Sequence, residues 1–83
     1  MNHVYFQQIP EGTNFHLVTK EYGPPYDVTL LTGGIKEYRY IQRNYLAPGV
    51  MEHVHFIITV SSDGFIIGKT TDTITGTIEL NIQ

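Results

Sequence analysis

The stretch VMEHVHFIITVSSDGFIIGKT, residues 50–70, decides the fold. Side chains at alternate positions of an extended strand point the same way, so its apolar residues would share one face. These residues are Val54, Phe56, Ile58 and Val60. Asp63-Gly64 suits a type I′ turn, whose two central residues both need positive φ. We therefore predict a β-hairpin in which Phe65 and Ile67 join the Phe56 side of the sheet across the turn.

Further short runs of Val, Ile, Thr, Tyr and Phe, with Gly and Pro turn signals between them, predict a mainly β domain. The last run alternates most clearly, with Ile74, Ile78, Leu80 and Ile82 on one side, and Gly76 among them predicts a bulge or a close backbone approach. The strands that we expect are His3–Gln8, Asn14–Lys20, Tyr26–Thr32, Val50–Val60, Phe65–Thr70 and Thr73–Ile82.

Residues 35–46, IKEYRYIQRNYL, fit two structures. Their tyrosine content favours a strand, which would place Tyr38 opposite Val28 if the loop before it has an odd number of residues. Their apolar residues also fall within one arc of a helix, which Pro48 would end. We favour the strand slightly and leave the helix open.

The chain has 83 residues and no cysteine. This length predicts one domain, residues 1–83, with a thin stability margin that disulfides do not support. We expect a mainly β fold, either a small barrel or a two-layer antiparallel sheet, with one short helix at 35–46 or an α+β arrangement as alternatives.

The net charge is −3, from five basic and eight acidic residues. Duplex nucleic acid is therefore an unlikely partner, since it needs a dense basic surface. The N-terminus lacks a basic region followed by an apolar run, and no stretch has the roughly 18 apolar residues of a membrane span. We expect a cytoplasmic protein without a membrane partner.

The sharpest chemical pattern is His53-Val-His55, because two imidazoles on one side of a strand are placed to bind one metal ion. A complete site needs a third ligand and usually a fourth, and Glu52 falls on the other side. His3 or His16 would have to be supplied by the fold. We therefore favour a solvent-facing or interface pair, with no metal or cofactor assigned.

Aromatic and arginine residues cluster between positions 38 and 45. These types are enriched at protein interfaces, and they also stack on single-stranded bases, although the net charge argues against the latter. Core packing of the tyrosines is the alternative. The candidate binding residues are Tyr38, Arg39, Tyr40, Arg43, Tyr45, His53 and His55.

Catalytic groups are not assembled by any local motif. The serines, Ser61 and Ser62, flank a turn, and the acids are scattered singly, so no nucleophile or acid–base pair is placed. We expect a non-catalytic protein that docks on another macromolecule, of the kind phages and mobile elements use to inhibit host systems. The alternatives are a metal-binding small-barrel protein or enzyme using His53 and His55, and a homo-oligomeric structural subunit assembled through edge strands.

Overall fold

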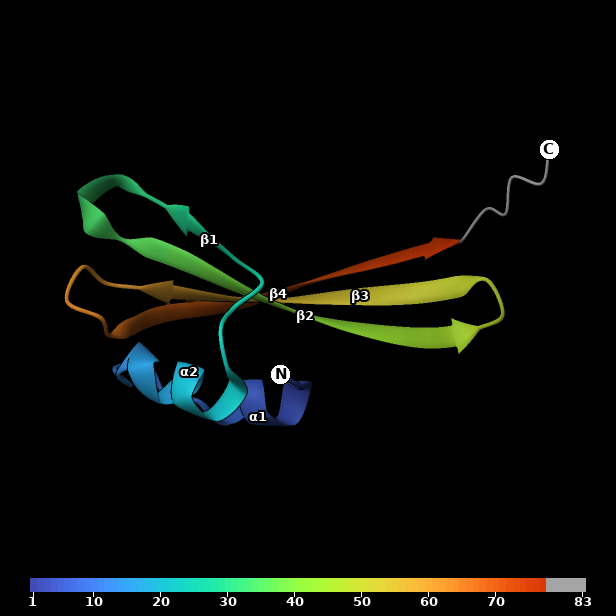
Figure 1. Ribbon diagram of the computed structural model, residues 1–83, viewed down its shortest axis with the longest axis horizontal. Coiled ribbons are helices and arrows are strands. Elements are labelled where there is room, and N and C mark those ends of the chain that lie inside the picture. Colours follow the sequence, from blue (N-terminus) through green and yellow to red (C-terminus); the bar gives the residue numbers. More distant parts are fainter. Residues whose placement is uncertain (78–83) are drawn as a thin grey trace.

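A computed structural model of the chain describes residues 1–77. Two short helices pack on one face of a four-stranded antiparallel sheet with the order β1-β2-β3-β4 (Figure 1). The elements are α1 (His3–Gln8), α2 (Phe15–Tyr22), β1 (Asp27–Leu30), a 3-10 turn (Thr32–Gly34), β2 (Lys36–Ala47), β3 (Val50–Val60) and β4 (Ile66–Thr77). The prediction of a mainly β antiparallel fold is confirmed. The sheet is unclosed, so of the two architectures expected the barrel is not formed.

The first two predicted strands, His3–Gln8 and Asn14–Lys20, are wrong, because both segments are helical. Asparagine side chains cap each helix. The Oδ1 atom of Asn2 accepts a hydrogen bond from the Tyr5 N–H (2.8 Å), and that of Asn14 accepts one from the His16 N–H (2.9 Å). Such caps satisfy backbone donors that the first helical turn leaves free.

Helical spacing then buries one side of each segment. Phe6 and Ile9 are three residues apart and buried, as are Phe15 and Val18. Gly23 ends α2 with a φ of 79°, which a residue with a side chain adopts only at a cost. No helix within residues 1–77 is long and apolar enough to cross a membrane.

Residues 36–46 of the ambiguous segment lie in strand β2, as favoured, and not in a helix. The loop between β1 and β2 places positive φ at Gly33 and Gly34, and the Leu31 N–H bonds to the Ile35 carbonyl (2.8 Å). Val28 therefore lies opposite Tyr38, the pairing expected for an odd-numbered loop.

The hairpin β3–β4 forms, but its turn differs from the type I′ prediction. Positive φ occurs at Gly64 (94°) and not at Asp63, so the turn is of the kind that ends in a single left-handed glycine. A β-bulge lies next to the turn, since Thr59 pairs with Gly68 while Val60 pairs with Ile66. The bulge turns Ile66 into the core.

Next to the bulge, two side chains lie elsewhere than the sequence predicted. Phe65 is 42% exposed and Ile67 is 49% exposed, so neither joins the Phe56 side as predicted. The predicted strands Phe65–Thr70 and Thr73–Ile82 are one strand, β4, whose predicted continuation after Thr77 lies outside the described residues. Gly76 pairs regularly with Met51, without the bulge or close approach that we expected.

Phe56 lies at the centre of the core between the sheet and the helices. Its ring centroid lies 5.0 Å from that of Phe6 and 5.2 Å from that of His3, both on α1. Lys69 on β4 donates a hydrogen bond from Nζ to the Phe6 carbonyl (2.8 Å), at the C-terminal end of α1. The helices are thus held to both β3 and β4.

The helices cover only part of the sheet. Val54 is the last buried residue of β3 towards its start, and beyond it the strands project as an arm, which we define as residues 43–53 and 74–77 (Figure 1). No arm residue with a described side chain is buried. The radius of gyration is 15.1 Å, against about 12 Å for a compact domain of this length. The arm accounts for this elongation.

Replacement of Phe56 by alanine should remove the contacts that hold α1 to the sheet. We expect a loss of about 3–5 kcal/mol in the free energy of unfolding. Ile57→Ala, one position along on the other side of β3, is the control and should cost about 1 kcal/mol. Chemical denaturation measures both, and equal losses would contradict this placement of the core.

Candidate functional site

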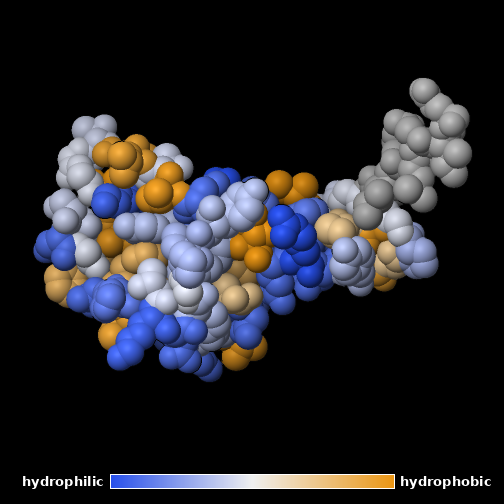
Figure 2. All heavy atoms as spheres, in the orientation of Figure 1, coloured by the Kyte–Doolittle hydropathy of each residue, from blue (hydrophilic) through white to orange (hydrophobic). Residues whose placement is uncertain are grey.

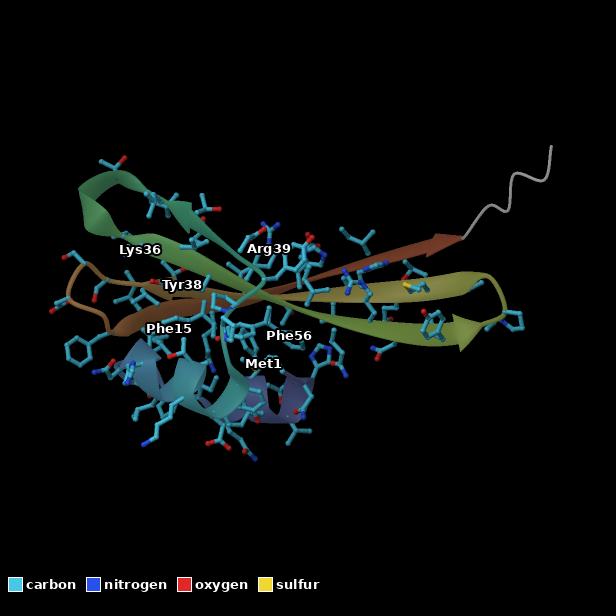
Figure 3. All side chains as sticks on the ribbon, in the orientation of Figure 1. Met1, Phe15, Lys36, Tyr38, Arg39 and Phe56 are labelled. Carbon is cyan, nitrogen blue, oxygen red and sulfur yellow. The ribbon has the colours of Figure 1, made fainter. Side chains whose placement is uncertain are left out.

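The face of the sheet opposite the helices is uncovered, and we call it the open face. The register between strands shows which side chains share it. Its central members are Arg39, Ile41, Arg43 and Tyr45 on β2, Met51, His53, His55, Ile57 and Thr59 on β3, and Gly68, Thr70, Asp72, Ile74 and Gly76 on β4. Figure 3 shows Arg39 on this side, with Phe15 and Phe56 towards the helices.

Two of the seven candidate binding residues face the helices. The Tyr40 side chain is 6% exposed, and its hydroxyl donates a hydrogen bond to the Gly23 carbonyl (2.9 Å). Tyr38 stacks on Phe15 with ring centroids 4.0 Å apart. Both rings are engaged in the core, so we leave them out of the candidate surface.

The other five candidates come together on the open face. They are Arg39, Arg43, Tyr45, His53 and His55. Strand alternation separates them from the two tyrosines, because neighbouring residues of a strand point to opposite faces. The sequence cluster at 38–45 is therefore one group along the chain and two groups in space.

Positive charge is divided unevenly between the two faces. Both arginines of the chain lie on the open face, whereas the three lysines lie on α2 or on the helix side of the sheet. The Arg39 guanidinium lies 3.6 Å from the Asp27 carboxylate, a half-exposed pair worth about 0–1 kcal/mol. The Arg39 Nε atom is hidden from solvent without a hydrogen-bond partner. Arg43 is exposed.

His53 and His55 project from one side of β3, as the pattern predicts. Their neighbours across the sheet are Arg43 and Ile74 for His53, and Ile41 and Asp72 for His55. His3 cannot complete a site with them, since it packs on Phe56 from the helix side.

Within residues 1–77, no three histidines or acids are grouped to hold a metal ion. Glu52 lies on the helix side of β3, where its carboxylate accepts a hydrogen bond from the Asn44 amide (3.1 Å). The metal-site hypothesis thus gains no third ligand from the described part of the chain.

The surface is broad and shallow. The described residues enclose no pocket. Ser61, a candidate nucleophile by residue type, uses its hydroxyl to accept the Phe65 N–H (3.1 Å) and bonds to the Asp63 carboxylate, which closes the β3–β4 turn. This geometry suits contact with a large partner surface and not enclosure of a small molecule.

Sequence reasoning missed the apolar part of the open face. Ile41, Ile57 and Ile74 share it with the two histidines, and Met51 lies on the arm. Ile57 follows His53 and His55 at alternate positions of β3, and the register places Ile41 opposite His55 and Ile74 opposite His53. Tyr45 and Ile74 are 76% and 52% exposed. Figure 2 shows apolar surface along the arm as well as on the part of the molecule that carries the helices.

Comparisons with known proteins supply no further guide to the site, because no family model, no curated protein and no solved structure matches the chain. The case for a function therefore depends on the open face itself, through its shape, its residue types and their exposure.

Alkaline pH should test the placement of Tyr40 in the core. Burial, with smaller effects from Tyr5 and Tyr38, raises the pKa of Tyr40 from the ordinary 10 to about 12. The folded state then keeps a proton that the unfolded state releases, so this contribution to stability is complete below pH 10 and lost as pH rises to 12.

Denaturant titrations between pH 8 and 11.5 measure this effect. We expect the free energy of unfolding to fall above pH 10, and to fall less steeply in Tyr40→Phe. An equal pH dependence in the variant and the wild type would contradict the burial of the Tyr40 hydroxyl.

Proposed function

We propose that this chain is a small non-catalytic binding protein that docks on another protein through the open face of its sheet. The observation that carries the proposal is the composition of this face. Arginine, tyrosine, methionine and isoleucine occupy it without a lysine, while the chain's own helices cover part of the other side.

This composition fits a protein interface. Interface centres are enriched in Arg, Met and aromatic residues and depleted in Lys, because these side chains bury much area and are desolvated at lower cost than an ammonium group. Isoleucines at positions 41, 57 and 74 provide apolar area between the polar groups. A partner that covers them gains the free energy of burying that surface.

Electrostatics favour a protein partner over duplex nucleic acid. Arg39 is already paired with Asp27, and Asp72 lies on the same face as Arg43. Neutralising a run of phosphates needs several unpaired cations in a row. The face supplies one exposed arginine, Arg43, and mixed polar groups instead.

The shallow surface supports a blocking action. A domain that covers a partner over a broad face prevents other molecules from binding there, and it needs no catalytic group to do so. This is how an inhibitor of a host system would act, and it is the form of the proposal that we favour.

Affinity capture from cells of the source organism, followed by titration with the purified partner, tests the proposal. The test variant is Arg43→Ala/Tyr45→Ala, which removes two exposed side chains of the open face. We expect at least about a tenfold weaker affinity, since arginine and tyrosine are frequent hot spots. Leu17→Ala/Lys20→Ala on the exposed side of α2 is the control and should bind like the wild type.

Circular dichroism establishes that both variants are folded. Equal binding by the Arg43/Tyr45 variant, or loss of binding in the α2 control alone, would move the interface away from the open face. Failure of the wild type to capture any protein would count against the proposal as a whole.

A further inference from the structure

The open edges of the sheet differ in how they are protected. Native sheets discourage pairing with other chains by means of short edge strands, proline, lysine and bulges. β1 has four residues and comes after Pro24-Pro25. β2 extends past β1, but its register shifts between Tyr45 and Ala47 and it ends before Pro48. β1 is therefore a poor template, and the regular, uncovered part of the β2 edge is limited to residues 40–45.

The outer edge of β4 is protected only at its beginning. The Gly12 N–H bonds to the Ile66 carbonyl (2.7 Å), and the Ile66 N–H bonds to the Thr13 carbonyl (2.9 Å). Lys69 then reaches across to the end of α1. Within the described residues, no further backbone hydrogen bond from outside the sheet reaches β4 after Ile66.

From Gly68 to Thr77 this edge is regular. The register with β3 runs without a shift, and the segment after Lys69 contains no lysine or proline and one charged residue, Asp72. Threonine and isoleucine, which favour extended structure, make up most of it. Its unpaired amides and carbonyls form a template of the kind to which another strand adds.

We propose that β4 pairs in antiparallel fashion with β4 of a second copy of this chain, which gives a two-fold symmetric dimer with a continuous eight-stranded sheet. The pairing brings like with like, as a two-fold interface requires. With one charged residue in residues 70–77, the edge presents little repulsion to its own copy, provided that Asp72 does not lie opposite itself.

The sequence after Thr77 supports a second copy as the occupant. Val50, the first residue of β3, pairs with Thr77, so β3 has no further residue to offer beyond this pair. Residues 78–83, IELNIQ, nevertheless continue the alternation of apolar residues that Ile74 begins. A second copy carries the same sequence next to its own β4, so an antiparallel pair brings this alternating sequence from both chains to the same edge.

The dimer inference does not depend on the proposed function. If both hold, the dimer would strengthen docking on a partner that has two matching sites. Residues directly opposite each other in an antiparallel pair point to the same side of the sheet. The two open faces would therefore lie side by side on one surface. A partner with two matching sites would then bind with an avidity that neither face gives alone.

Sedimentation equilibrium of the purified full chain tests this inference without any partner. At about 100 µM, where a micromolar dimer is mostly associated, we expect twice the chain mass of 9.4 kDa. The variant Thr73→Lys/Thr75→Lys places two lysines on the exposed edge and leaves the open face unchanged. It should raise the dimer dissociation constant about tenfold or more.

The charge-matched control is Thr29→Lys/Thr32→Lys, at the opposite edge of the sheet, and it should remain a dimer. A wild-type mass of one chain at this concentration would overturn the inference. So would a folded Thr73/Thr75 variant that dimerises like the wild type. Because Thr73 and Thr75 lie on the helix side of β4, the Thr73/Thr75 variant leaves the open face intact, and its failure is distinct from a failure of the docking proposal.

Single cysteines introduced at positions 71 to 77 provide a second measurement, because the chain has no cysteine of its own. Under mild oxidation, we expect disulfide-linked dimers to peak at the position nearest the two-fold axis, where equivalent backbones are about 5 Å apart. Cysteine at position 29 is the control and should form no disulfide-linked dimer. Uniform or absent crosslinking along β4 would overturn the pairing.

Discussion

Packing of α1 and α2 on Phe56 and its neighbours is the constraint on which the rest of the structure depends. The two helices have six and eight residues and so span about 9 and 12 Å, whereas the eleven residues of β3 span about 36 Å. A helix layer of this size covers one part of one face. The arm and the whole open face are left to solvent or to a partner, and the docking proposal follows from this imbalance.

One side of the sheet therefore packs against the helices and stabilises the fold, and the other side is left uncovered. Phe56, Ile58 and Val54 are fully buried on the helix side, while the side chains between them in sequence are partly exposed. Substitutions on the open face should then cost little in the free energy of unfolding. A thin sheet with a short helix layer is enough to present this face.

The sequence predicted the sheet better than the helices. Apolar residues alternate strongly from Val54 to Val60, and this pattern predicted β3 correctly. His53 and His55 lie on the face opposite Phe56, as expected. The two helices were missed because their segments are short and rich in aromatic residues, and the capping roles of Asn2 and Asn14 were not weighed against that composition. The candidate binding residues included two from the wrong face, Tyr38 and Tyr40, because the sequence did not decide whether residues 35–46 form a strand or a helix.

Some features could not be read from local pattern at all. The bulge that turns Ile66 inward is set by the geometry of the β3–β4 turn and by pairing of Gly12 and Thr13 along β4. The extent of the arm depends on how far the helices reach, which is a property of the tertiary packing. Both decide which apolar residues remain exposed.

Methyl NMR with a soluble paramagnetic gadolinium chelate measures most directly whether one face of the sheet is covered and the other open. Ile57 and Ile58 are adjacent on β3, and Ile58 is fully buried. We expect strong relaxation of the Ile57 and Ile74 methyl groups and almost none at Ile58 and Ile66. Equal protection of Ile57 and Ile58 would show that the chain covers both faces, and it would contradict the division of the sheet into a packed side and an open face.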